Sequence, residues 1–168
     1  MPKQVVNKTR LSGPALYGKI PAHGDFVSRG LKRGQISEID SWLKLWFERA
    51  KTDWGDLFEH NYRVSQPWLF SGEQITAILI PSFDRVERLF PLFACVGVGA
   101  RAQRLYDVVF TAIAEQKSVD ILFEDLKTLK CDAEKADAKG WSLPDSIEVA
   151  MPHPFFADIT DWVKGVVQ

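Results

Sequence analysis

Two nearly continuous apolar runs in the middle of the chain constrain its fold more than any other feature. Residues 75–80 and 92–98 contain almost no polar side chain, and strands of this kind lie centrally in a sheet with both faces covered. Three strands are expected here, at 68–70, 75–80 and 89–98, separated only by short turns. Because parallel neighbours need a crossover of a dozen residues or more, these strands should pair antiparallel.

Helical periodicity flanks this central region on both sides. In residues 37–51 the apolar side chains recur at spacings of three and four, which is typical of an amphipathic helix. The other expected elements are a strand at 15–20, helices at 55–61, 105–116 and 119–129, a late strand at 146–150 and a final helix at 155–166. The expected fold class is α/β, a three-layer α/β/α sandwich whose mainly antiparallel (mixed) central sheet is flanked by helices. We expect residues 1–168 to form a single domain, with 1–13 as a frayed N-terminus.

The composition excludes several classes of protein. Hydrophobic residues make up 46% of the 168 residues and the formal net charge is −1, which excludes an intrinsically disordered chain. The balance of 21 Lys+Arg against 22 Asp+Glu argues against a general nucleic-acid binder, which needs a basic excess. No apolar run reaches the roughly 18 residues of a membrane span, and the N-terminal segment lacks the apolar stretch of a secretory signal. We therefore expect a cytoplasmic protein without direct membrane insertion, in which Cys95 is a buried free thiol.

The aromatic content is high, with 6 Trp, 11 Phe and 3 Tyr, and it indicates either a heavy core or a surface built for contact. Trp42 and Trp46 fall on one helical face and Trp68 falls on a strand, so these three are expected in the core. The other three, Trp54, Trp141 and Trp162, lie in poorly patterned stretches, and we expect one or more of them to be exposed contact residues.

The sequence contains none of the common enzyme motifs that would indicate catalysis. The sequence contains no G-x-S-x-G elbow, no G-x-x-x-x-G-K-[ST] loop and no G-x-G-x-x-G fingerprint. Its three histidines form no metal-ligand pair. His23 and Asp25 could orient an imidazole for general-base work, but nothing marks a nucleophile beside them. The alternative is a loop in which Asp25 caps backbone N–H groups. We expect no catalytic residue, no metal and no cofactor.

The segment 17–31 is dense in glycine and charge, and two interpretations remain open. Glycines at this density permit positive φ and close backbone approach, which binding loops often need. The structural alternative is a tight loop in which Asp25 pairs with Arg29 and Phe26 anchors the core.

The segment 80–92 is a charged hairpin between two buried strands, and it is equally ambiguous. If strand pairing continues through it, alternation places Arg85 on the opposite side from Asp84 and Arg88. A surface cluster of ion pairs worth under about 1 kcal/mol each is one interpretation. An arginine held beside a groove for a carboxylate or phosphate is the other.

Together these segments resemble the TagF (also called ImpM) family of bacterial type VI secretion-associated proteins. The family pattern is similar to G-[KR]-x-P-x-x-G-D-F-[VI]-x-R-x-L, then D-x-W-L, W-x-F and [MI]-P-S-x-D-x-x-G-R-x-[FY]-P-L. The matching segments follow in the same order: Gly18-Lys19-Ile20-Pro21, Gly24-Asp25-Phe26-Val27-Ser28-Arg29-Gly30-Leu31, Asp40-Ser41-Trp42-Leu43, Pro67-Trp68-Leu69-Phe70, Ile80-Pro81-Ser82-Phe83-Asp84-Arg85 and Arg88-Leu89-Phe90-Pro91-Leu92. Glu87 departs from the pattern, because it stands where the family has glycine.

The resemblance implies a non-enzymatic regulator. Family members repress type VI secretion after translation, in association with the threonine-phosphorylation pathway and its forkhead-associated scaffold protein, which becomes the expected partner. The resemblance implies one candidate interaction surface: Gly18, Lys19, Pro21, Gly24, Asp25, Phe26, Arg29, Ser82, Asp84, Arg85 and Arg88. The alternative function is an anion, phosphate or nucleotide sensor, with Lys19, Arg29, Arg85 and Arg88 lining a basic pocket. A hydrolase using His23 and Asp25 is the weakest alternative.

Overall fold

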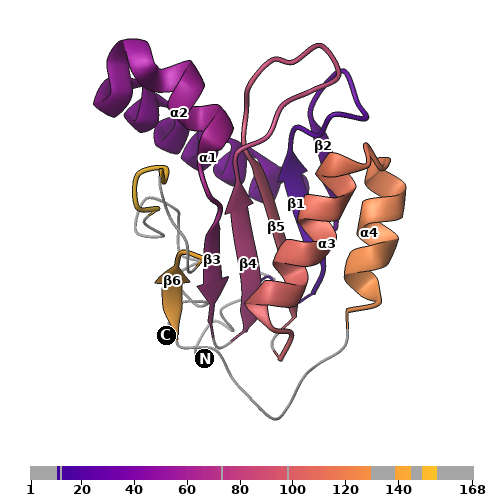
Figure 1. The fold of residues 1–168 in the computed structure, drawn as a ribbon. Coiled ribbons are helices and arrows are strands. Elements are labelled where there is room, and N and C mark those ends of the chain that lie inside the picture. Colours follow the sequence, from indigo (N-terminus) through magenta and orange to yellow (C-terminus); the bar gives the residue numbers. More distant parts are fainter. Residues whose placement is uncertain are drawn as a thin grey trace, which may run out of the picture.

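A computed structural model describes residues 11, 13–72, 74–97, 99–129, 139–144 and 149–154. Its centre is a six-stranded sheet in the order β2-β1-β5-β4-β3-β6, in which every neighbouring pair of strands is antiparallel (Figure 1). The strands are β1 Ala15–Gly18, β2 Val27–Arg29, β3 Trp68–Ser71, β4 Ile75–Ile80, β5 Leu92–Gly97 and β6 Gly140–Ser142.

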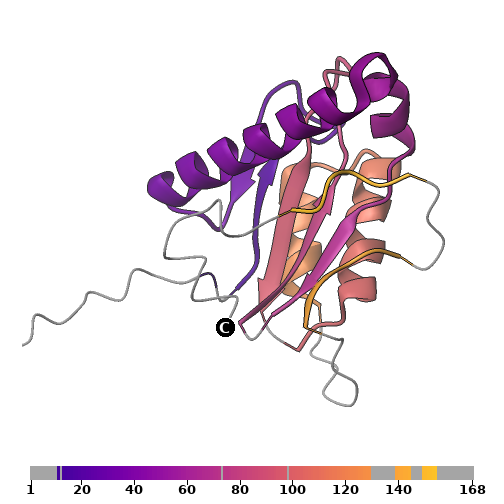
Figure 2. The same ribbon diagram turned by 90° about the vertical axis from the view of Figure 1, so that its left-hand side faces the viewer.

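Helices cover both faces of this sheet. The long helix α1 (Arg33–Trp54) lies across one face and continues through η1 (Gly55–Leu57) into α2 (Phe58–Val64). Helices α3 (Ala102–Ala114) and α4 (Val119–Lys127) lie on the opposite face, as Figure 2 shows. The predicted α/β/α sandwich with an antiparallel sheet is therefore confirmed. In the part of the chain that the structure describes, each helix is too short or too polar to span a bilayer.

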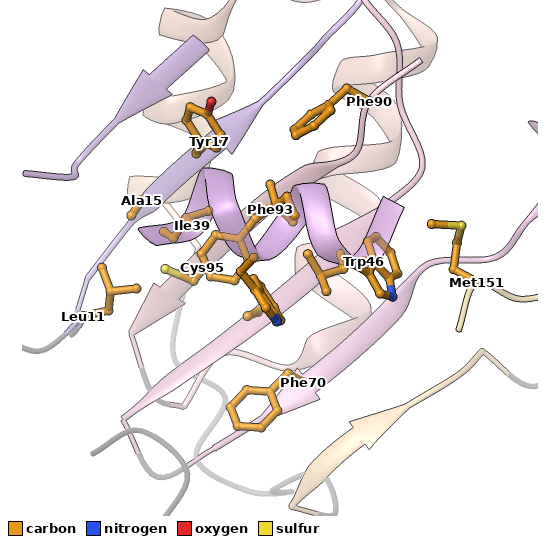
Figure 3. Packing of buried hydrophobic residues seen from close by; sticks show 14 of the residues in the cluster. Leu11, Ala15, Tyr17, Ile39, Trp46, Phe70, Phe90, Phe93, Cys95 and Met151 are labelled. Atoms are coloured by element: carbon orange, nitrogen blue, oxygen red, sulfur yellow. The ribbon is translucent and has the colours of Figure 1, made fainter. Parts of the chain in front are cut away.

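The apolar residues 75–80 and 92–97 form the inner strands β4 and β5. Every residue of β4 is buried, because its alternate side chains enter different cores. Ile75, Ala77 and Leu79 pack toward α1, whereas Ile78 and Ile80 pack toward α3 and α4. Figure 3 shows the α1 side, where Trp46, Phe93 and Phe70 fill the space between the helix and the sheet.

The strand and helix boundaries differ from prediction at several points. Residues 27–29 form the short edge strand β2 rather than part of a loop. Helix α1 begins at Arg33 rather than at residue 37, and β5 begins at Leu92 rather than at 89. Within the segment expected to be frayed, Leu11 is buried against the core. Most of the expected strand at 146–150 and the whole expected helix at 155–166 lie outside the described residues.

The tryptophans divide differently from the prediction. Trp42 and Trp46 are buried as predicted, and Trp68 is half-buried with its Nε1 donating to the Met151 carbonyl at 2.9 Å. Trp54 and Trp141 pack against the same core, so neither is an exposed contact residue. Trp162 lies outside the described residues. Cys95 is a buried free thiol as predicted, and burial raises its pKa to about 12.

Candidate functional site

The two motif segments, far apart in the sequence, lie side by side at one end of the sheet. The loop between β1 and β2 meets the hairpin between β4 and β5 there (Figure 1). The backbone N–H of Arg85 donates to the His23 carbonyl at 2.8 Å, and Arg88 Nη2 donates to the Gly24 carbonyl at 2.7 Å. Arg85 Nη2 donates to the Ala22 carbonyl. We call residues 22–26 and 85–88 together the paired-loop surface.

Asp84 lies at the centre of this contact and is completely buried. Its Oδ2 accepts from Arg88 Nε at 2.7 Å and from Lys19 Nζ at 3.1 Å. Its Oδ1 accepts the backbone N–H groups of Val86 and Arg88, each at 3.0 Å. Burial by itself would raise the pKa of Asp84, but the hydrogen bonds from Arg88 and Lys19 outweigh it and lower the pKa to about 2. The ionised carboxylate therefore joins both segments.

The tip of the hairpin is a tight turn closed by a hydrogen bond from the Glu87 N–H to the Asp84 carbonyl at 2.9 Å. Glu87 has a φ of 64°, and glycine is favoured at such a left-handed position after a turn. This conformation explains the glycine in the family pattern. Strand pairing does not continue through the tip, so the predicted alternation does not hold. Asp84 is buried, whereas Arg85 and Arg88 are both exposed.

Phe26 contributes an apolar part of the paired-loop surface. Its ring stacks on Tyr17, with 5.7 Å between the centroids, and meets the edge of Phe90 at 5.0 Å. The ammonium of Lys19, a residue only 8% exposed, lies 5.0 Å from the Phe26 ring centroid. Phe26 is nevertheless 41% exposed, so it is held against the core without being enclosed by it.

Backbone geometry explains two further motif residues. Gly18 has a φ of 143°, and a Cβ there would lie 2.2 Å from the Pro91 carbonyl oxygen, so only glycine fits where β1 passes the end of the hairpin. Pro21 is buried in a turn closed by the His23 N–H and the Ile20 carbonyl at 3.2 Å.

Ser82 is buried at the base of the hairpin and is fixed there by Tyr62. The Ser82 N–H donates to the Tyr62 hydroxyl, which donates in turn to the Ser82 carbonyl, each at 2.9 Å. Burial raises the pKa of Tyr62 well above its ordinary value, so the hydroxyl keeps its proton. Helix α2 is thereby connected to the hairpin.

The first motif segment contacts helix α4 through Arg29 and His23. Arg29 pairs with Asp120 at 2.9 Å, so the Asp25–Arg29 pair of the structural alternative is wrong. The N–H of Val119, the first residue of α4, donates to His23 Nε2 at 3.0 Å. Asp25 Oδ1 accepts the N–H of Phe26 at 2.7 Å, as the capping alternative predicts.

The structure therefore divides the candidate residues into two groups. The supporting group is buried beneath the surface and comprises Gly18, Lys19, Pro21, Ser82 and Asp84. The outer group is exposed and comprises Gly24, Asp25, Phe26, Arg85 and Arg88. Arg29 is half-buried beside α4. Sequence reasoning missed Val86, which is 65% exposed at the hairpin tip. An apolar residue between charged neighbours in a turn was the available signal.

Several charged or titratable side chains of this arrangement are engaged by other groups of the chain. Lys19 and Arg88 both pair with Asp84 and Arg29 pairs with Asp120, so three of the four cations of the alternative anion pocket already have a carboxylate partner. His23 Nε2 and Asp25 Oδ1 each accept a backbone N–H. Within the described ranges, no cluster of His, Cys, Asp and Glu could hold a metal ion.

Comparisons with known proteins agree with the motif resemblance. Residues 15–140, which include both motif segments, match the family described as the TagF N-terminal domain, type VI secretion system-associated. The crystal structure of PA0076 from Pseudomonas aeruginosa PAO1 is similar to this chain, with a TM-score of 0.58 and 22% sequence identity. The similarity covers 83% of this chain and 72% of PA0076, and at this identity it supports the fold alone. No curated protein matches the chain.

Proposed function

Because this chain belongs to the TagF N-terminal domain family, which is associated with type VI secretion, we propose that it represses assembly of the secretion apparatus after translation. In this proposal the protein is cytoplasmic and non-enzymatic, and it acts by binding an apparatus component. The forkhead-associated scaffold protein is the proposed partner. The paired-loop surface is the proposed contact site.

The observation that carries the proposal is the Asp84 network. The buried Asp84 carboxylate accepts hydrogen bonds from four donors and so joins two segments that are distant in sequence. The exposed charged and apolar side chains of the outer group lie on these two segments. Preorganised loops of this kind lose little conformational freedom when a partner binds. Mixed charge beside exposed apolar groups suits specific protein docking better than general electrostatic attraction.

Arg85 is the residue best suited to reach a partner. Its neighbour Arg88 is committed to Asp84 and Gly24, whereas the exposed Arg85 side chain donates to the Ala22 carbonyl of the facing loop. It stands next to the exposed Val86, so a partner covering the tip would contact a cation and an apolar side chain together.

A cell-based assay tests the repression directly. Overproduction of the wild-type chain in a secreting strain should lower secretion of the exported proteins. The Arg85→Glu variant should lose this effect while accumulating to the same level. Arg33→Glu is the matched control, because it makes the same charge change at an exposed residue in the first turn of α1. Repression retained by Arg85→Glu, or lost equally in Arg33→Glu, would contradict the proposal.

A further inference from the structure

A pocket of about 340 Å³ lies beside the hairpin, between the end of α2, the strand ends at residues 80–83 and helix α3. Its volume is at the lower end of the roughly 300–1,000 Å³ typical of ligand pockets, which suits one or two side chains better than a large cofactor. The walls are mainly apolar, with Phe83 and Leu89 from the hairpin and Tyr106 and Phe110 from α3.

The rim of this pocket exposes apolar surface to solvent. Phe110 is 50% exposed although its ring stacks on Tyr106, with 5.6 Å between the centroids. Val64, at the end of α2, is 47% exposed on the other wall. Exposed apolar groups that flank a concave space are typical of a contact site for another protein.

One charged residue, Arg63, is among the described residues that line the pocket. Among the residues that the structure describes, its ion-pair partner is Glu59, one helical turn away, with Nη2 and Oε1 3.3 Å apart and both side chains exposed. Such a surface pair is worth only a few tenths of a kcal/mol, so the guanidinium is available to a carboxylate brought in by a partner.

The pocket also shares the hairpin with the paired-loop surface. Phe83 and Leu89, which line the pocket, form the β-bridge at the neck of the same hairpin whose tip carries Arg85 and Val86. A partner that covers the tip is therefore close to the pocket mouth.

We propose that this pocket receives a large aliphatic or aromatic side chain from a segment of a protein partner in which an acidic residue stands next to the apolar one. The apolar side chain enters between Phe110 and Leu89, and the carboxylate pairs with Arg63. That the occupant belongs to a protein rests on the proposed docking function. The preference for an apolar side chain beside a carboxylate rests only on the residues that line the pocket.

The experiment uses the capped dipeptide acetyl-Asp-Leu-amide as probe and records ¹H–¹⁵N spectra of the whole chain. Saturable shifts are expected at the amides of Val64, Leu89 and Phe110 at millimolar peptide. Phe110→Ala should weaken binding at least tenfold. Ile121→Ala is the matched control, because Ile121 is 51% exposed on α4 and is not among the lining residues; it should leave binding unchanged.

The charge is tested with acetyl-Asn-Leu-amide, which should bind the wild type several times more weakly than the Asp peptide. In Arg63→Gln the two peptides should bind equally. Absence of saturable shifts, equal loss in Phe110→Ala and Ile121→Ala, or an Asp preference that survives Arg63→Gln overturns the proposal. Concentration-dependent shifts of the same amides without peptide, together with a dimer mass, would assign the pocket to a second copy and also overturn it.

Failure of this proposal and failure of the docking function are distinguishable. Arg85→Glu should leave dipeptide binding unchanged, since Arg85 does not line the pocket. If Arg85→Glu represses normally while the dipeptide binds as expected, the paired-loop assignment is wrong and the pocket stands. If the dipeptide does not bind while Arg85→Glu loses repression, only the pocket is wrong.

Discussion

Asp84 shows how a single buried charge can hold two loops without acting as a contact residue. Its four hydrogen-bond donors come from Lys19, Val86 and Arg88, and Arg88 in turn reaches the opposite loop. Removing one partner of a buried ion pair is costly, because the other charge stays buried without compensation. Asp84→Asn should therefore lower the free energy of unfolding by about 3 kcal/mol. Chemical denaturation measures this, and a loss below about 0.5 kcal/mol, the range of exposed surface changes, would contradict the network.

The same carboxylate predicts a pH dependence. Its folded pKa of about 2 lies below the ordinary value of 3.8, so its contribution to stability is complete above about pH 4. Protonation removes that contribution as the pH falls from about 4 toward 2. Wild-type stability should drop over this interval, and Asp84→Asn should show a shallower drop. Asp25→Asn, an exposed control in the neighbouring loop, should follow the wild type.

Glu87, unlike Asp84, is expected to destabilise the fold, because its backbone adopts a conformation that non-glycine residues disfavour. Its φ of 64° costs a non-glycine residue about 1 kcal/mol. Glu87→Gly should therefore raise the free energy of unfolding by about 0.5–1 kcal/mol, even though glycine adds entropy to the unfolded chain. Glu87→Ala removes the carboxylate but keeps a Cβ, so it should give no gain. Equal effects of the two substitutions would show that charge, not backbone conformation, decides stability here.

At the scale of elements, Gly18 fixes how closely β1 and the hairpin can approach. Gly18→Ala places a Cβ 2.2 Å from the Pro91 oxygen at a φ of 143°, so either β1 or the hairpin must move. We expect a loss of at least about 2 kcal/mol. Gly34→Ala is the control, because it lies in α1 with no atom near its Cβ position. It should stabilise the chain by up to about 1 kcal/mol, as thermal unfolding would measure.

Helix α4 depends on the first motif segment through His23. The imidazole accepts the Val119 N–H at the start of the helix, and losing one such hydrogen bond costs about 1 kcal/mol. His23→Ala should therefore speed hydrogen exchange at Val119 and in the first turn of α4 roughly fivefold. His60→Ala, an exposed histidine on α2, should leave this exchange unchanged. Unchanged hydrogen exchange in His23→Ala would show that His23 does not stabilise the start of α4.

The elements that the sequence predicted best are those with long, strong patterns. β4 and β5 were recognisable because their apolar runs are buried on both faces, and α1 because its apolar residues recur over many turns. β2 was missed because only Val27 of its three residues is buried, so pairing with β1 rather than its own pattern makes it a strand. The early start of α1 was missed because Gln35 caps it by accepting from the Lys32 N–H, without the usual Ser, Thr, Asp or Asn.

For the whole molecule, the motif residues could be predicted, but which of them are buried and which are exposed could not. Sequence indicated that Lys19, Asp84 and Arg85 belong to one candidate surface. It did not indicate that Lys19 and Asp84 lie underneath while Arg85 lies outside, because burial depends on how the two loops cross. The sequence also did not indicate that Arg29 pairs with Asp120 or that His23 accepts from Val119, because α4 comes to lie beside β2 only in the folded chain.

If the paired-loop surface docks a protein partner, substitutions on it must change the dissociation constant for the purified forkhead-associated scaffold protein. Isothermal titration calorimetry with wild type, Arg85→Glu and Arg33→Glu gives three values under one condition. We predict that Arg85→Glu binds at least about 30-fold more weakly, as expected for a residue at the centre of an interface. Its Tm should stay within a few degrees of wild type, because Arg85 is exposed and its side chain gives up a hydrogen bond to the Ala22 carbonyl at the surface. Equal dissociation constants for the three proteins, or no binding by the wild type, would show that the paired-loop surface does not dock this partner.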